Sequence, residues 1–540
     1  LDVGGRRNKN DVDFNRQHGV RAKLNWYASD NLEFVFTGGV EDSEFGAPGV
    51  GSSAYRQDTT TSARFPHGAT DEQKYANLTV RYDLGFAQLT SSTSYFDRET
   101  TYKEQLPDFF TSFFEPAADI FRSFIPGLPE GGPVFDSYGV DGAGDGTAER
   151  LVQEFRLVSD GDGKLTWTAG LYFSESESGF GRATSDGLLI VANPGFEVFE
   201  PFLSSTASSL VEIETTEISI YGEMGIRLND DWDLTLGARF VRAETEALTS
   251  DVDFDDDYVS PKATLTWRPD EDWMVYGTVS QGFRRGVFNG DLINLLSQIR
   301  NSPVPIPGGD AFLDQFSSFT STDGDEVLNY EVGYKASFLD NRLNLSTAIY
   351  HIDWDDALVA ARFDLPPGVA GANVYTVNGG EAHTQGIELE LTAMLTDRLT
   401  MTFTGDHLAD AEIDKANAAI GVTTITDGAR LADAPDYSLS LAFDYSMPVF
   451  DNLELNAHID VYRVDDTFSG VDNAAAQQND AFTNVNLRLS LSDPNRSWQV
   501  SLFGQNLNDD EYTYSIGNFG SRYGSPRLIG LEVSYDLNGR

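Results

Sequence analysis

Cysteine is absent from the 540 residues, which excludes disulfides, thiolate metal sites and cysteine nucleophiles. Long apolar runs are missing too, since a stretch such as residues 188–192 is far shorter than the roughly 18 residues of a membrane helix. Basic residues are scarce: 37 stand against 85 acidic ones, and the net charge of -48 argues against nucleic acid and anionic membrane surfaces as partners. No Pro/Ser-rich linker divides the chain, so we expect one large closed unit over residues 1–540.

Catalytic motifs are also lacking. The sequence contains no nucleophile elbow, no Walker loop and no zinc-protease motif. The six histidines show no metal-ligand spacing with one another: His18, His67, His351, His383, His407 and His458. We therefore expect no enzyme, no cofactor and no metal site.

Strict alternation of apolar and polar residues is what the chain does have. In residues 526–537, Ile529, Leu531, Val533 and Tyr535 alternate with mostly polar residues, which sends apolar side chains to one face. The same pattern recurs in residues 399–404, 438–445 and 453–461. Such strands suit a half-solvated antiparallel sheet or a membrane barrel with a wet lumen, and about ten residues is the length of a tilted membrane strand.

Tight turns rich in Asp and Asn join these strands in pairs. We identify nine, at residues 29–31, 83–85, 160–164, 229–231, 268–272, 340–341, 396–397, 448–452 and 492–496. Long connections separate the pairs, including residues 98–149, 284–325 and 410–435. Short turns at one end and long loops at the other are typical of outer-membrane barrels.

The strand count predicts the size of the barrel. Nine turns give about eighteen strands, and the closing strand makes about nineteen. Because bacterial barrels have an even number, about three more first strands would give 22, the size of plugged outer-membrane transporters.

Tryptophans support this interpretation. All seven except Trp354 lie close to a tight turn, as expected for an interfacial girdle at the short-turn rim. The alternative is that they pack the core of a soluble sandwich, which would scatter them along the strands.

Several segments resemble the barrel of TonB-dependent outer-membrane receptors. Residues 276–289 resemble the family's stretch with tyrosine, Gly-Phe-Arg and Phe-Asn, and residues 328–335 are similar to its Tyr-Glu-Leu-Gly-x-Lys strand. Further matches are residues 379–390 with a Gly-x-Glu strand, residues 503–512 with Asn-Leu-Thr-Asp-x-x-Tyr, and the C-terminal strand from residue 526. Two departures are Leu537, where the family usually has a final aromatic residue, and the lack of any counterpart to the plug domain and TonB box.

The resemblance implies an all-β transmembrane antiparallel barrel in the outer membrane of a Gram-negative bacterium, with the plug and about three first strands missing from these residues. It implies active, TonB-energised uptake of a scarce nutrient, by default a ferric siderophore or other iron complex. The expected partners are outer-membrane lipid, the TonB complex through the missing plug, and a small-molecule ligand such as a metal chelate, with the receptor a monomer. The rivals are a passive porin-like channel, a transporter of glycans or other nutrients, and an outer-membrane enzyme or adhesin.

Alternation assigns one set of polar side chains to the lumen. In the family these would contact the plug or line the ligand's path, whereas the plainer interpretation is solvated or mutually paired lumen charges. The set is Arg284, Tyr276, Glu331, Lys335, Glu388, Glu390, Glu154 and Arg156. Arg284 is the sharpest candidate because it ends a strand within the best-matching segment.

Two connections carry further candidates. The connection over residues 101–138 is rich in phenylalanine, including Phe109, Phe110, Phe113 and Phe114, which either contact a ligand from the external loop or pack locally. The acidic residues 251–257 are either a calcium loop or, as we favour, a solvated acidic loop, because the glycine and terminal glutamate of a calcium loop are missing. Residues 292–299 are expected to form a short helix.

Overall fold

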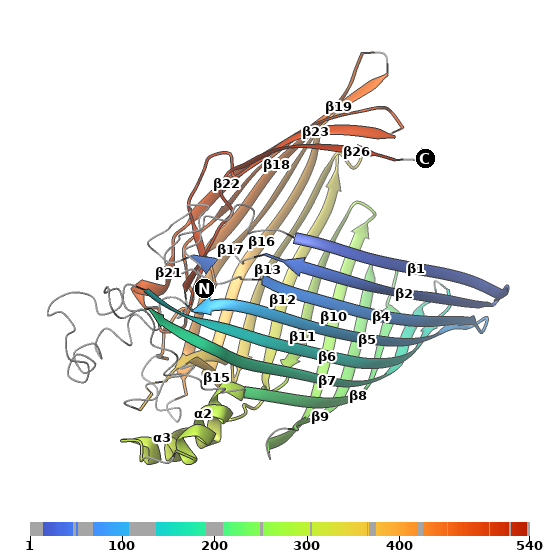
Figure 1. The fold of residues 1–540 in the computed structure, drawn as a ribbon. Helices are drawn as coiled ribbons and strands as arrows, with labels where there is room; N and C mark the ends of the chain where they lie inside the picture. Colours follow the sequence, from blue (N-terminus) through green and yellow to red (C-terminus); the bar gives the residue numbers. More distant parts are fainter. Residues whose placement is uncertain are drawn as a thin grey trace.

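The computed structural model describes most of the chain (Figure 1). The residues it describes are 15–46, 50–51, 68–106, 137–161, 163–190, 209–248, 252–302, 305–363, 365–366, 374–417, 425–450, 452–495, 497–517 and 520–536.

One antiparallel sheet of nineteen strands dominates the described residues. Each strand pairs with the next one along the chain, as in an up-and-down barrel wall. The strands are β1 Asn15–Ser29, β2 Leu32–Phe45, β4 Gly68–Asp83, β5 Ala87–Leu106, β6 Ser137–Ser159, β7 Leu165–Ile190, β8 Ser209–Arg227, β9 Trp232–Ala247, β10 Val252–Asp270, β11 Trp273–Arg284, β12 Asp325–Phe338, β13 Leu343–Asp355, β16 Gly380–Thr396, β17 Leu399–Ala416, β18 Tyr437–Val449, β19 Leu453–Val464, β22 Phe482–Ser492, β23 Trp498–Gln505 and β26 Leu528–Tyr535. The predicted strand count and all nine tight turns are confirmed.

The sheet is open among the described residues, because no pairing joins β1 to β26 (Figure 1). Every residue of β1 is exposed, and so are all but one of β26. Both edge strands therefore present backbone groups that a neighbouring strand could pair.

The outer face of the wall is apolar. Val279 of β11 is 44 % exposed and Ile349 of β13 is 63 % exposed, although both lie in the middle of paired strands. Large apolar side chains left open in this way suit lipid rather than water. The opposite face carries the polar residues of the alternation.

An aromatic girdle marks the short-turn rim. Trp232 and Trp267 stack with ring centroids 5.8 Å apart, Trp267 meets Trp273 edge-on at 5.2 Å, and Trp273 lies 6.1 Å from Tyr334. These four rings cross four neighbouring strands beside the tight turns. This part of the predicted girdle is confirmed.

Tyrosines on the inner face lie flat over glycines of the next strand. Tyr276 is the direct cross-strand partner of Gly333, and a Cβ on that glycine would come within 2.3 Å of the ring. Tyr221 covers Gly170 in the same way, with 2.1 Å to the position of an added Cβ. Tyr350 faces Gly386. Only glycine leaves room for these rings against the wall.

Several strands are longer than a membrane requires, and this corrects three expectations. β5, β6 and β7 have 20, 23 and 26 residues, so residues 98–106 and 137–149 are strand and not connection. β17 likewise continues to Ala416, into the stretch expected to be loop from residue 410. The acidic residues 252–257 belong to β10, paired with β9, and are not a loop. Strands that rise above the lipid have water on both faces, which removes the apolar alternation that marks a strand.

A small packed unit, the cap, lies at the end of the long connections. It contains α2 Gly290–Arg300, α3 Gly309–Phe316, the 3-10 turn Ser317–Phe319 and the hairpin of β14 Leu358–Arg362 with β15 Val374–Asn378. Its core buries Leu292, Leu295, Phe312, Phe316, Phe363 and Val377, together with Ala382, Ala411 and Ile413 of the wall. The helix expected over residues 292–299 is confirmed.

The remaining short elements lie in other connections. They are β3 Val50–Gly51, β20 Thr467–Phe468, the 3-10 turn Ala475–Gln477, β21 Gln478–Asn479, β24 Thr513–Gly517 and β25 Gly520–Tyr523. Neither α-helix of the described residues has the length and apolar character needed to cross a membrane.

Candidate functional site

Three of the predicted lumen residues meet between β11 and β12. The Tyr276 hydroxyl donates to Glu331 Oε1 at 2.6 Å, and the Lys335 ammonium lies 5.9 Å from the centre of the Tyr276 ring. Because alternate residues of a strand share a face, this group lies on the inner face of the wall, whereas Val279 lies on the outer face. Tyr276 thus contacts a carboxylate through its hydroxyl group and lies near an ammonium group through its ring.

Lys335 and Glu390 also line a cavity of about 380 Å³ near the tight turns. Arg268, Glu271 and Asp272 of the adjoining turn contribute further charges. Glu388 lies higher on β16, directly opposite Asp406 of β17. Two cationic side chains and three carboxylates therefore line the cavity together.

Glu154 lies on a different part of the wall. Its carboxylate accepts a hydrogen bond from the Tyr221 hydroxyl, two strands away. Arg156 follows at the next position of the same face of β6. Four strands separate this pair from Tyr276, so the predicted residues are spread around the lumen and do not form one pocket.

Arg284 ends β11 and is held by Asp325, the first residue of β12. The Nε atom lies 3.0 Å from Asp325 Oδ1, and Nη2 contacts Oδ2 and donates to the Leu358 carbonyl at 3.1 Å. Asp325 also accepts from Trp354 Nε1 at 2.8 Å and from the Leu358 amide at 2.9 Å. The carboxylate thus ties three wall strands to the β14 hairpin of the cap.

Asp325 lies at the cap end of β12 and is only 2 % exposed. Burial alone would raise the pKa of its carboxyl group, but the hydrogen bonds from Arg284, Leu358 and Trp354 lower that pKa below its ordinary value. The group is therefore a stable buried anion at neutral pH.

Asn289 is the second polar anchor of the cap, just before α2. Its amide nitrogen donates to the carbonyls of Phe319 and Thr376, and its amide oxygen accepts from the Thr376 amide. Asn289 ends the segment that resembles the family's Phe-Asn stretch, but neither Asn289 nor Asp325 is among the site residues predicted from the sequence. Their partners lie on other strands, and spacing along the chain carries no signal for such contacts.

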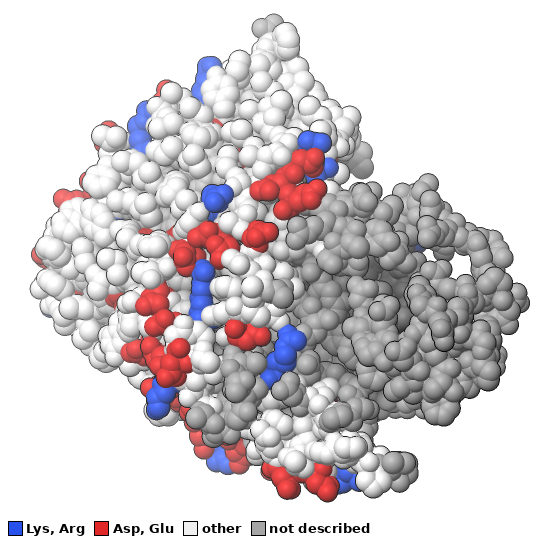
Figure 2. Space-filling view, turned by 90° about the vertical axis from the view of Figure 1, so that its left-hand side faces the viewer, with Lys and Arg blue, Asp and Glu red and all other residues white. Residues whose placement is uncertain are grey.

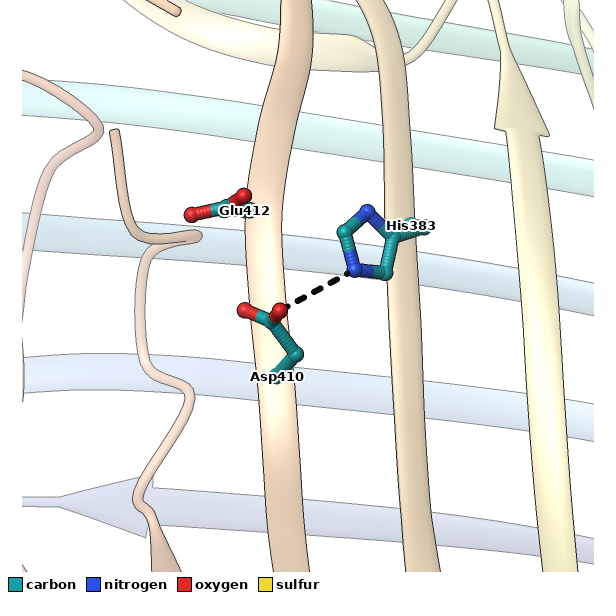
Figure 3. A group of neighbouring side chains, drawn as sticks. All are labelled: His383, Asp410 and Glu412. Atoms are coloured by element: carbon teal, nitrogen blue, oxygen red, sulfur yellow. Dashed lines mark ion pairs between the residues drawn. The ribbon is translucent and has the colours of Figure 1, made fainter. Parts of the chain in front are cut away.

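One group joins a histidine to carboxylates on neighbouring strands. His383 of β16 lies beside Asp410 and Glu412 of β17 (Figure 3). The spacing of the histidines did not reveal it, because the other members are acidic and cross-strand. The predicted loop residues Phe109, Phe110, Phe113 and Phe114 lie outside the described residues.

The described surface at the long-connection end is rich in acid. Figure 2 shows clusters of Asp and Glu side chains there, with fewer Lys and Arg between them. This agrees with the net charge of -48. Such a surface attracts cations and repels anionic polymers.

Together the apolar outer face, the aromatic girdle, the polar inner face and the tight turns define a transmembrane β-barrel of the outer-membrane type. Residues 5–507 match the family described as TonB dependent receptor-like, beta-barrel. The chain belongs to this family, and its place is the outer membrane of a Gram-negative bacterium. The resemblance seen in the sequence is confirmed.

Curated relatives match parts of the chain. The metal-pseudopaline receptor CntO of Pseudomonas aeruginosa is 32% identical over 119 residues, which are 22% of this chain and 15% of that protein. The probable TonB-dependent siderophore receptor PiuA of Acinetobacter baumannii is 25% identical over 252 residues, 44% of this chain and 30% of the relative. The matches therefore span less than a third of these relatives' lengths.

A solved structure matches the fold more widely. The ferric yersiniabactin uptake receptor FyuA from Yersinia pestis superposes with a TM-score of 0.70 at 14% identity. The superposition covers 96% of this chain and 70% of the FyuA chain. The likeness confirms the barrel architecture.

Proposed function

We propose that this chain is the transport barrel of a receptor for active, TonB-energised uptake of a small metal chelate, by default a ferric siderophore. The observation that carries the proposal is the size of the wall. The nineteen antiparallel strands of the described residues, whose two edge strands do not pair with each other, exceed the 16 to 18 strands of passive porins. A wall of this size supports assignment to the class with 22 strands and a plugged lumen.

The family and its named relatives support the choice of ligand class. CntO is a metal-pseudopaline receptor, PiuA a probable siderophore receptor and FyuA a ferric yersiniabactin uptake receptor. All three names describe receptors for siderophores or metal chelates, and the name of FyuA also describes uptake. The proposal assigns the barrel no catalytic step.

A plug outside residues 1–540 is part of the proposal. It would fill the lumen, contact the charged residues of the inner wall and link the receptor to TonB. The wall residues proposed to meet the plug or the passing ligand are Tyr276, Glu331, Lys335, Glu388, Glu390, Glu154 and Arg156. Arg284 does not contact the plug or the ligand in this proposal and acts indirectly, because its guanidinium binds Asp325 and holds the cap. The partners are otherwise lipid and the ligand, with the receptor a monomer.

The test is uptake of ⁵⁵Fe-labelled siderophores by iron-starved cells that express the intact receptor as their only receptor for each compound. The expected result is accumulation that stops when TonB is deleted or the proton gradient is collapsed. Accumulation that continues without TonB would contradict the proposal.

Conductance of the purified intact receptor in planar bilayers separates the rival function. A passive porin gives steady open channels, whereas a plugged receptor gives none until the plug is unfolded by denaturant. TonB-dependent uptake of a glycan or another nutrient, with no uptake of any metal chelate, would keep the transporter and replace its ligand.

A further inference from the structure

We propose that His383, Asp410 and Glu412 form a binding site for a divalent transition-metal ion of the Zn²⁺ type on the outer surface of the wall. The three side chains each offer one ligand atom, and these atoms all lie within 4.8 Å of one another (Figure 3). His383 Nε2 and Asp410 Oδ2 are 3.4 Å apart. Bonds of about 2.0–2.2 Å at tetrahedral angles place two zinc ligands about 3.4 Å apart, so this pair already has the required separation.

A fourth residue orients the imidazole. Asp414 Oδ1 lies 2.8 Å from His383 Nδ1, the ring nitrogen on the far side from Asp410. When Nδ1 donates its proton to Asp414, Nε2 keeps a free lone pair on the side of the ring where Asp410 lies. A carboxylate behind the histidine is the arrangement that fixes the tautomer in metal sites.

The strand register places the group on the outside of the wall. His383 shares its face of β16 with Ile387, an exposed apolar residue, and lies directly opposite Glu412. A bulge in β17 between Leu408 and Asp410 lets the carboxylates of Asp410 and Glu412 take the same outer face. The group therefore lies on the outer face of the wall, on the cap side of Ile387, where the side chains of His383 and Asp410 are 15 % and 40 % exposed.

The inner face of the same stretch belongs to the cap. Ala382 of β16 and Ala411 and Ile413 of β17 alternate with the ligand residues and are buried in the cap core. A metal bridging β16 and β17 would brace the two strands on which the cap packs. The site is thus on the opposite side of the wall from the lumen, and it does not depend on which nutrient is transported.

The ligand set selects the class of ion. One imidazole nitrogen with two carboxylates suits Zn²⁺ and its first-row neighbours, whereas Ca²⁺ prefers six to eight oxygen ligands and Mg²⁺ keeps most of its waters. Three protein ligands leave a fourth position for water.

His458 provides a matched control within the same barrel. It also contacts two aspartates, but Asp444 lies at its Nδ1 at 2.7 Å and Asp460 at its Nε2 at 3.2 Å. Each ring nitrogen of His458 thus faces a single carboxylate, and in the described part of the chain three possible ligand atoms come together only at His383, Asp410 and Glu412. His458→Ala should therefore leave metal binding unchanged.

The experiment uses the intact receptor purified in detergent, stripped with a chelator and titrated with Zn²⁺ in competition with a chromophoric indicator. The wild type and His458→Ala should bind one Zn²⁺ more per receptor than His383→Ala and Asp410→Asn. Asp414→Asn should keep the site with affinity lowered roughly 10- to 100-fold. Excess Ca²⁺ or Mg²⁺ should not displace the ion. Heat-modifiable gel mobility verifies that every variant is folded.

The brace has its own readout, the rate of trypsin cleavage after Arg362 in the cap hairpin. Zn²⁺ should slow this cleavage in the wild type and not in His383→Ala. Equal Zn²⁺ binding by wild type and His383→Ala, or displacement by Ca²⁺, would overturn the site. Equal protection of both proteins by Zn²⁺ would overturn the brace.

Discussion

The wall and the cap place their apolar side chains in opposite positions, on the outside of the wall and in the interior of the cap. Along the wall, apolar residues such as Ile349 stand on the outer face and the polar residues line the inside. In the cap, Phe363 is completely buried, packed against Phe316 at 4.6 Å and Tyr375 at 5.3 Å between ring centroids. Apolar side chains of the same chain therefore face lipid in the wall and pack against one another in the cap. The change from one arrangement to the other occurs near the cap ends of β11 to β17.

The difference shows which interactions stabilise each region. The wall has a continuous ladder of backbone hydrogen bonds and needs lipid on its outside. The cap has short elements and depends on a closed apolar core with a few buried polar anchors. A substitution should therefore damage one region and spare the other, in an order set by the size of each effect.

The largest effect is expected from Phe363→Ala. Removing a fully buried phenylalanine costs about 3–5 kcal/mol, because it leaves a cavity in the cap core. Trypsin should then cleave the cap rapidly while the barrel keeps its heat-modifiable mobility. The matched control is Phe240→Ala on the outer wall, where the ring is 53 % exposed and its loss creates no cavity. Equal protease resistance of the two variants would contradict the separate cap core.

Val279→Arg should damage the wall instead. A cation on the lipid face near the middle of a strand costs about 2–4 kcal/mol, so the amount of folded barrel in the outer membrane should fall. The control is the adjacent Thr278→Arg, which points to the lumen and has Glu331 directly across. Similar losses for both variants, measured by heat-modifiable mobility, would reverse the assignment of faces.

Arg284→Ala tests the joint between the two regions. The substitution leaves Asp325 buried with fewer hydrogen bonds, which lowers the stability of the joint by about 1–3 kcal/mol. Because the Arg284 side chain is half-exposed, the loss should lie toward the low end of this range. The folded barrel should persist, the cap should become easier to cleave, and uptake should fall. Unchanged cleavage with reduced uptake would mean that Arg284 contacts the ligand or plug directly.

The same joint should respond to pH. Because the folded-state pKa of Asp325 is lowered, its contribution to stability is present above the unfolded value of about 3.9 and is lost as the pH falls through the folded value. Cap cleavage by an acid-tolerant protease should therefore rise only below about pH 4. In Arg284→Ala the burial of Asp325 is less well compensated, so the rise should begin at higher pH.

The smallest effect is expected at Glu532 on β26. Its carboxylate pairs with Arg488 Nη2 at 2.8 Å, but both side chains are well exposed, so Glu532→Ala should cost no more than about 0.2–1 kcal/mol. Leu531→Asp, one position away on the lipid side, should lower the amount of folded barrel. Comparable losses for the two variants would show that this edge strand is not oriented as described.

The wall could be predicted from the sequence where it contacts lipid. Alternation such as that around Leu531 and the Asp/Asn turns reflect local rules, and these located the strands and turns. The ends of β5, β6 and β10 nearest the long connections were not predicted to be strand. Beyond the lipid both faces of a strand meet water, so acidic residues such as Asp253 and Asp255 are acceptable on either face. Strand pairing continues there without an apolar signal.

The contacts at the ends of the strands were harder to predict from the sequence. The helix at residues 292–299 has apolar residues at helical spacing and was found. The Arg284–Asp325 pair and the His383–Asp410 pair join residues 41 and 27 positions apart, through register and through a bulge. A single sequence gives the alternation of each strand but not the exact pairing between strands.

The glycines under Tyr276, Tyr221 and Tyr350 have a consequence for the width of the passage. A tyrosine that stood upright on the wall would reach into the lumen, whereas a ring lying over Gly333, Gly170 or Gly386 adds only the thickness of an aromatic plane. The wall thus keeps aromatic surface and hydroxyl groups without narrowing the bore. Alanine at any of these glycines would push the ring inward, so the absence of a Cβ atom at these three positions keeps the passage wide.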